Sequence, residues 1–186
     1  MPPRVKVTRE NIIDTAVELV RAGGIQTVNA RDVAGVLQCS TQPIFSNFAT
    51  MDELRQAVIE KAEDLFCVFM QQEAAKGIYP SYKASGMAYI RFAKEEKELF
   101  KLLYMRERND DRSPREKDIW NQMEIMVQNQ TGLAGGKKTL FHLEMWTFVH
   151  GIATMFATGY LDLEWELVSE MITDAYQGLK KRYEME

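Results

Sequence analysis

Cysteine is scarce in this 186-residue chain, and long apolar runs are missing. Only Cys39 and Cys67 occur, which is too few for a disulfide framework or a thiolate metal site. No segment approaches the ~18 consecutive apolar residues of a membrane-spanning helix. The segment 1–7 also has no apolar core of the kind that signal peptides contain. We therefore expect a cytoplasmic protein with no membrane partner.

Sequence patterns that mark enzymes and metal sites are missing as well. Neither His142 nor His150 follows a glutamate by three residues, so the Glu-x-x-His element of di-iron helical bundles is absent. The glycine-rich segment 132–137 does not have the spacing of a phosphate-binding loop. There is no nucleophile elbow, although a triad assembled from distant segments would leave no such pattern. We expect no metal, no cofactor and no enzymatic activity.

Strand-like alternation of apolar and polar residues is absent too, and apolar residues recur instead at the three- and four-residue spacing of helices. Helices are expected at about 8–23, 29–37, 40–48, 50–76, 81–94, 99–105, 114–130, 137–159 and 163–183. Their expected N-caps are Thr8, Asn29, Ser40, Thr50, Ser113 and Asp162. The sequence therefore predicts an all-α fold of about nine helices. The unbroken helix over 50–76 would link the N-terminal helices mechanically to the rest of the chain.

Residues 29–48 predict two short helices around a tight turn. The turn consists of Gln38 and Cys39. Apolar residues spaced for one face of each helix are expected in the core, namely Val33, Ala34, Val36, Leu37, Ile44, Phe45 and Phe48. Polar residues of the second helix would point away from that core, namely Thr41, Gln42, Ser46 and Asn47. This arrangement is typical of a helix-turn-helix that faces DNA.

Charge favours a nucleic-acid partner only weakly. The chain has a net charge of −4. Its first 48 residues hold five basic and four acidic residues, a net charge of +1, which leaves −5 for the remainder. Three of the basic residues, Arg4, Lys6 and Arg9, lie at or before the first helix, where an arm could reach an adjacent groove. A solvated terminal tail would give the same pattern.

Four segments near the helix-turn-helix carry a family resemblance. They are Thr27-Val28-Asn29-Ala30-Arg31-Asp32-Val33-Ala34, Cys39-Ser40, Ile44-Phe45-Ser46-Asn47-Phe48 and Thr50-Met51-Asp52-Glu53-Leu54. Together they resemble the DNA-binding domain of the tetracycline-repressor (TetR) family, over roughly residues 8–55. The resemblance implies a helix-turn-helix DNA-binding domain in 1–49. It also implies a helical effector-binding and dimerisation domain in 50–186.

Three positions depart from the family pattern. Phe45 stands where the family commonly has a tyrosine whose hydroxyl reaches a phosphate, and Met51 stands where a lysine often does the same. Pro43 replaces a small hydroxyl residue, but it fits in a first helical turn, where backbone N–H groups have no intrahelical acceptors. Phosphate contacts supply much of the affinity for DNA. The sequence therefore predicts either weaker DNA binding or compensation from Arg4, Lys6, Arg9 and Arg31.

A second resemblance lies in Trp146-Thr-Phe-Val-His150-Gly151, which is similar to a Trp…His-Gly signature in the regulatory domain of some TetR-family members. It implies a pocket for a small effector, lined by adaptable apolar side chains with a few polar tips. The residues expected to line it are Phe66, Met70, Phe92, Tyr104, Trp120, Met123, Met126, Trp146 and His150. Spacing alone favours a packed core for these residues, and a packed histidine with one hydrogen bond for His150.

The last two predicted helices, about 137–159 and 163–183, carry more apolar surface than a peripheral position in a small monomer requires. The resemblance implies that they pair with a second copy across a two-fold axis, as a four-helix bundle. The alternative is that both helices pack inside the monomer.

These expectations converge on a transcriptional regulator, a repressor that a small apolar or amphipathic ligand releases from a double-stranded DNA operator. The residues expected to contact DNA are Arg4, Lys6, Arg9, Arg31, Ser40, Thr41, Gln42, Phe45, Ser46 and Asn47. The alternative is a helical small-molecule binding or sensor protein with weakened DNA binding. Phe45, Met51 and the low basic charge of the N-terminal segment favour that alternative.

Overall fold

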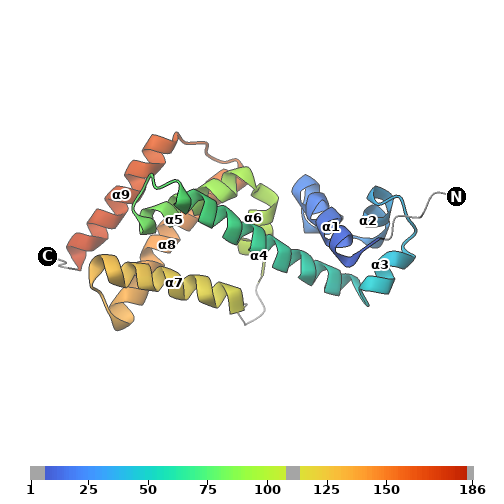
Figure 1. The fold of residues 1–186 in the computed structure, drawn as a ribbon. Helices are drawn as coiled ribbons and strands as arrows, with labels where there is room; N and C mark the ends of the chain where they lie inside the picture. The colour runs from blue at the N-terminus through green and yellow to red at the C-terminus, as the bar shows by residue number, and fades with distance from the viewer. Residues whose placement is uncertain (1–6, 108–113, 184–186) are drawn as a thin grey trace. The chain divides into compact units, whose positions relative to one another are not determined.

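The computed structural model describes residues 7–107 and 114–183, and all regular elements in this part of the chain are helical (Figure 1). The elements are α1 (Arg9–Gly23), the 3-10 helix η1 (Ile25–Thr27), α2 (Ala30–Val36), α3 (Gln42–Asn47), α4 (Met51–Ala75), α5 (Ser81–Glu95), α6 (Lys97–Tyr104), α7 (Pro114–Thr131), α8 (Gly135–Thr158) and α9 (Trp165–Arg182). The predicted all-α fold is confirmed. Among the described residues, no helix has both the length and the apolar content of a membrane span.

The helices form two compact units. The first comprises Met1–Phe66 and Glu96–Arg106, and the second comprises Cys67–Glu95 and Glu107–Glu186. The long helix α4 contributes its first part to the first unit and its last part to the second. The functional division into 1–49 and 50–186 remains a prediction, because compactness does not reveal what each part binds.

The first unit is built around α1, which packs against η1, α2, α3 and α6. Thr8 caps α1 as predicted, since its hydroxyl accepts a hydrogen bond from the Asn11 N–H at 3.1 Å. Arg21 donates to both carboxylate oxygens of Glu96, at 2.9 and 2.8 Å, beside the start of α6. The buried side chains of α1 and α6 are Ile12, Ala16, Val17, Val20, Leu99, Phe100, Leu102 and Leu103. Three short N-terminal helices bury little surface alone, and α6 enlarges their core.

The second unit is built around α5, which packs against α7, α8 and α9. Its core side chains include Tyr82, Met87, Ile90, Phe92, Phe141, Met145, Val149, Ile152, Phe156, Val168 and Ile172. A Cβ atom at Gly86 would lie 3.4 Å from Cγ2 of Val149, at the short end of ordinary van der Waals contact. Gly86 therefore lies where α5 packs on α8.

Two apolar residues of the helix-turn-helix that were predicted to be buried are exposed. Val36 is 59% exposed and Phe45 is 52% exposed. Successive helix residues are rotated by about 100°, so burying Val33 and Ala34 turns Val36 outward. In the same way, α3 buries Ile44 and Phe48, which lie about one turn apart, and this places Phe45 outside the core.

Two predicted N-caps are also wrong. Thr41 rather than Ser40 precedes α3, and Glu164 rather than Asp162 precedes α9. Asp162 instead pairs with Lys94 at 2.5 Å, and this ion pair ties the α8–α9 connection to α5. The predicted N-cap at Ser113 lies outside the described residues, although α7 does begin at Pro114.

Candidate functional site

Backbone hydrogen bonds hold the turn between α2 and α3. Gln38 adopts a left-handed φ of 50°. The Gln38 N–H donates to the Gly35 carbonyl at 3.2 Å, and the Cys39 N–H donates to the Ala34 carbonyl at 3.0 Å. This pair of bonds is a Schellman motif. It ends α2 abruptly and redirects the chain toward α3, as the predicted turn at Gln38 and Cys39 requires.

Side-chain caps hold the other ends of the motif. The Oδ1 atom of Asn29 accepts from the Asp32 N–H at 3.0 Å, and its amide donates to the Asp32 carboxylate at 2.6 Å. After α3, the Thr50 hydroxyl accepts from the Glu53 N–H at 3.1 Å, while the Glu53 carboxylate accepts from the Ala49 N–H at 2.7 Å. The predicted caps at Asn29 and Thr50 are confirmed. They fix where α2 and α4 begin, on either side of α3.

The outer face of α3 is defined by what the helix buries. Ile44 and Phe48 are fully or almost fully buried in the first unit, which sets the rotation of this short helix. Gln42, Phe45 and Ser46 are consequently exposed. They lie at positions i, i+3 and i+4 and so share one face. Three of the residues predicted to contact DNA therefore share the exposed face of α3.

Two of the predicted DNA-contacting side chains on α3 bond to their own helix. The Ser46 hydroxyl donates to the Gln42 carbonyl at 2.9 Å, and the Asn47 amide donates to the Pro43 carbonyl at 2.8 Å. The Gln42 side chain makes no hydrogen bond within the described part of the chain. Gln42 is therefore the α3 amide that is available to an external partner.

The predicted basic contacts divide into three groups. Arg9 lies over the Phe48 ring at 4.5 Å from its centroid and pairs with Glu53 at 3.7 Å. Arg31 is exposed on α2. Arg4 and Lys6 lie outside the described residues. The Arg9 guanidinium is therefore partly engaged by contacts within the fold.

Ser40 and Thr41, which were also predicted to contact DNA, lie beside the turn. Ser40 is exposed and Thr41 is half-buried.

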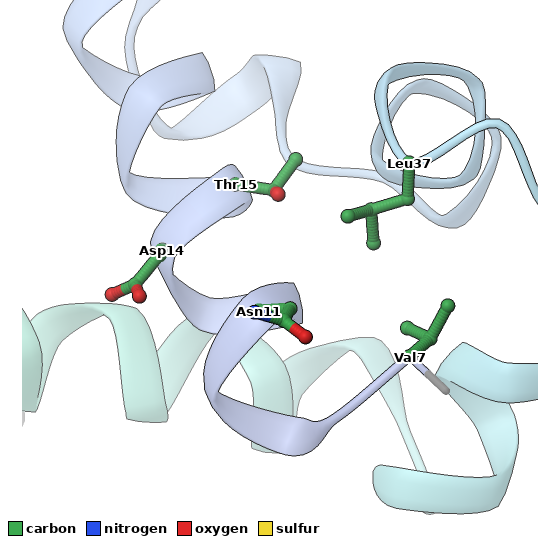
Figure 2. Close-up of a pocket in the computed structure, with 5 residues that line it drawn as sticks. All are labelled: Val7, Asn11, Asp14, Thr15 and Leu37. Carbon is green, nitrogen blue, oxygen red and sulfur yellow. The ribbon is translucent and has the colours of Figure 1, made fainter. Parts of the chain in front are cut away.

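A shallow pocket of about 350 Å³ lies in the first unit, between α1 and the end of α2 (Figure 2). Its lining residues are Val7, Asn11, Asp14, Thr15 and Leu37. Figure 2 shows Leu37 facing the α1 side chains across this space. Asp14 also pairs with Lys61 at 3.2 Å. None of the residues predicted to bind DNA or a ligand lines this pocket.

Two tyrosine–histidine pairs connect α5 to α8 in the second unit. The Tyr82 hydroxyl lies 2.9 Å from Nδ1 of His142, and the Tyr89 hydroxyl lies 2.9 Å from Nδ1 of His150. The first pair is buried and the second is partly buried. His150 thus has the packed, hydrogen-bonded environment that its position in the sequence favours. Tyr82, Tyr89 and His142 were not among the predicted site residues.

Two tryptophans complete an aromatic cluster with these histidines. The Trp120 ring, from α7, meets His142 edge-on at 4.5 Å, and the Trp146 ring stacks on His150 at 4.9 Å. The centroids of Trp120 and Trp146 are 6.3 Å apart. Three helices therefore contribute to one continuous group of rings, which we call the aromatic cluster (Tyr82, Tyr89, Trp120, His142, Trp146 and His150).

The surroundings of the aromatic cluster shift the pKa values of Glu124 and Tyr82 in opposite directions. Trp120 Nε1 donates to Glu124 at 3.0 Å, and Lys138 pairs with Glu124 at 3.1 Å. Burial alone would raise the pKa of Glu124, but hydrogen bonds from Thr139, Lys138 and Trp120 and the Lys138 charge lower it. Burial raises the pKa of the Tyr82 phenol, which therefore stays neutral.

In the described part of the chain, no group of three or more acidic, His or Cys side chains is arranged to hold a metal ion.

The other predicted ligand contacts are distributed over both units. In the first unit, the Phe66 and Tyr104 rings meet edge-on at 5.5 Å. In the second unit, the Phe92 ring meets Phe69 at 5.5 Å. Met70, Met123 and Met126 are half-buried. The structure thus brings Trp120, Trp146 and His150 together, and it places Phe66 and Tyr104 in a separate group.

An apolar stripe runs along the outside of α8. Its exposed apolar members are Leu140, Leu143 and Met155, and the small exposed residues Thr147 and Gly151 lie between them at the same spacing of three or four residues. Leu167 on α9 is exposed as well. Exposed leucines and methionines at helical spacing are unusual on a monomer surface and typical of a helix that pairs with another.

A segment that runs from α5 into α9 matches a known family. The model described as "Tetracyclin repressor-like, C-terminal domain" matches residues 82–175. No curated protein is matched by the sequence. Among solved structures, a protein of unknown function from Rhodococcus sp. RHA1 is similar at 19% identity and a TM-score of 0.73, over 98% of each chain. A member of the TetR family from Streptomyces coelicolor A3 is similar at 17% identity and a TM-score of 0.65, over 90% of this chain and 96% of that one.

Proposed function

The chain belongs to the TetR family of transcriptional regulators, and from this premise we propose that it is a homodimeric repressor released from its operator by a small apolar or amphipathic ligand. The observation that carries the proposal is the outer face of α3, where Gln42, Phe45 and Ser46 are exposed while Ile44 and Phe48 anchor the helix. A helix held this way presents side chains to the major groove.

The proposed dimer uses α8 and α9. The stripe from Leu140 to Met155, together with Leu167, supplies apolar surface of the kind that a self-complementary two-fold interface buries. A dimer is also what an operator with two half-sites requires, because the recognition helices must lie one helical turn of DNA apart, about 34–36 Å. Pairing of two copies through α8 and α9 would form a four-helix bundle.

The proposed ligand site adjoins the aromatic cluster. The phenol and imidazole groups of the cluster pair with one another, so its rings suit a ligand with a mainly apolar body. Such a ligand releases DNA only if it binds more tightly to a shape in which the recognition helices no longer fit both half-sites. A coupling of ~1–3 kcal/mol between the two sites suffices for a useful response.

The proposal is tested by fluorescence anisotropy with duplex DNA from beside the gene that encodes the chain. We expect sequence-preferring, salt-sensitive binding that weakens about fivefold or more in Gln42→Ala, given the ~1–3 kcal/mol that a good amide–base pair contributes. Gln122→Ala, an exposed amide on α7, is the matched control and should bind like the wild type. Binding that shows no sequence preference at any salt concentration would contradict the proposal.

A second candidate function is a helical small-molecule sensor with weakened DNA binding. It is favoured by the engagement of Arg9 with Phe48 and Glu53, and by the phenylalanine and methionine at positions 45 and 51. This candidate predicts that small apolar ligands raise the melting temperature while Thr41→Ala and Gln42→Ala leave DNA binding unchanged. The repressor proposal predicts that both substitutions change sequence preference at defined base pairs.

A further inference from the structure

The exposed ring of Phe45 is the unusual feature of the recognition helix. It is 52% exposed, yet it lies on the face of α3 that carries Gln42 and Ser46. Ile44 and Phe48 are buried on the other side, so α3 cannot rotate to bury Phe45 without exposing both of them. The ring is thus held outward by the core of the first unit.

A phenylalanine ring in this place has one favourable neighbour in the major groove. It has no hydroxyl to donate to a phosphate oxygen, and an aromatic face gains nothing from a solvated anion. The apolar group that the base edges present in the major groove is the C5-methyl group of thymine, and apolar side chains contact it. An outward Phe45 therefore favours thymine among the four bases.

The polar partner on the same face is Gln42. Ser46 and Asn47 are bonded to the carbonyls of Gln42 and Pro43, while the Gln42 side chain is available. A glutamine amide pairs with N6 and N7 of adenine. Gln42 and Phe45 are three residues apart, a rise of ~4.5 Å along the helix, which is close to the ~3.4 Å between successive bases of one strand.

We propose that α3 reads two neighbouring A·T base pairs in each half-site, with the Gln42 amide on an adenine and the Phe45 ring against a thymine methyl group. This inference rests on the proposed function, because it assumes that α3 enters the major groove. It goes further in naming the base composition that the chain selects. It also assigns Phe45 a specificity-determining role in place of a phosphate contact.

The test begins with the full chain and a pool of random duplex DNA, from which bound sequences are selected and one preferred operator is taken. Each thymine of that operator is then replaced in turn by deoxyuridine, which lacks only the C5-methyl group. We expect one replacement per half-site to weaken wild-type binding about fourfold, which corresponds to the ~0.8 kcal/mol of one buried methylene. In Phe45→Ala, the same replacement should have no effect.

Ile125→Ala is the matched control, because it shortens an apolar side chain of similar exposure on α7, which is not part of the proposed DNA-binding face. It should keep the deoxyuridine profile of the wild type. If Phe45→Ala binds too weakly to measure, the wild-type profile decides alone, since a profile without any sensitive thymine overturns the inference. An effect that persists unchanged in Phe45→Ala overturns it as well. Failure to enrich any sequence would instead refute the proposed function together with this inference.

Discussion

The hydroxyl of Tyr82 lies 2.9 Å from Nδ1 of His142, in the buried contact between α5 and α8. Seven residues along α5 and eight along α8, the same geometry recurs in Tyr89 and His150. Both pairs advance in the same chain direction, so α5 and α8 run parallel at this contact. The two hydrogen bonds therefore fix the register between the helices that carry the aromatic cluster.

Tyr82→Phe should destabilise the chain, because it removes a hydrogen bond from a buried imidazole without leaving a large cavity. The expected loss of unfolding free energy is ~1–3 kcal/mol. Tyr89→Phe should cost less, because His150 is only partly buried. Urea denaturation followed by circular dichroism measures both. Tyr160→Phe is the control, since Tyr160 is 78% exposed, and equal losses in all three variants would contradict the interpretation.

Stability should fall in alkaline solution through Tyr82. Burial is the main reason that the pKa of its phenol is raised above the usual 10.0, with the nearby Tyr176 adding to it. The unfolded chain then releases this proton from about pH 10 upward while the folded chain keeps it, so folding loses up to ~1.4 kcal/mol per pH unit in that window. The contribution is fully present below pH 10. The unfolding free energy should therefore fall less between pH 9 and pH 11 in Tyr82→Phe than in the wild type.

Gln38→Gly should stabilise the helix-turn-helix. Gln38 holds a left-handed φ of 50° at the Schellman motif, a conformation that costs a residue with a Cβ atom ~1–2 kcal/mol and glycine nothing. Part of that gain is lost to the greater freedom of glycine in the unfolded chain, so we expect a net gain of ~0.5–1 kcal/mol. Calorimetry would record it as a higher melting temperature. Gln38→Ala keeps the Cβ atom and should show no gain.

Local signals in the sequence were sufficient to locate the helices. Thr8, Asn29 and Thr50 cap the helices that they were expected to cap. Such a cap depends only on a side-chain oxygen and a backbone N–H two or three residues further along, so the local sequence is enough to predict it. The predicted N-cap at Ser40 was wrong by one position, since Thr41 precedes α3. The predicted N-cap at Asp162 was wrong for a tertiary reason. In particular, Asp162 is drawn to Lys94, which lies far away in the chain.

The orientation of short helices and the pairing of distant ones could not be predicted in this way. A helix of six residues such as α3 has too few apolar positions to define a stripe. The sequence therefore predicts burial for both Phe45 and Phe48, whereas only Phe48 lies in the core. The role of α6 in the first unit depends on Arg21 and Glu96, which are 75 residues apart. The tyrosine–histidine pairs left one faint signal, a spacing of two helical turns in both α5 and α8.

Leu143→Glu should dissociate the proposed dimer. Leu143 is 42% exposed in the middle of the apolar stripe on α8, and a two-fold axis would bring the same position of both copies into one interface. Two buried carboxylates would then lose hydration and repel each other, at a cost of several kcal/mol. Sedimentation velocity should show a dimer for the wild type and a monomer for this variant at micromolar concentration.

Ile125→Glu separates loss of pairing from a general effect of adding charge. Ile125 is 55% exposed on α7, so it resembles Leu143 in size and exposure but lies outside the stripe. This variant should remain dimeric and should bind operator DNA as the wild type does. Leu143→Glu should bind the same DNA at least tenfold more weakly, because one recognition helix without its partner contacts a single half-site. A folded Leu143→Glu protein that stays dimeric would place the interface elsewhere on the chain.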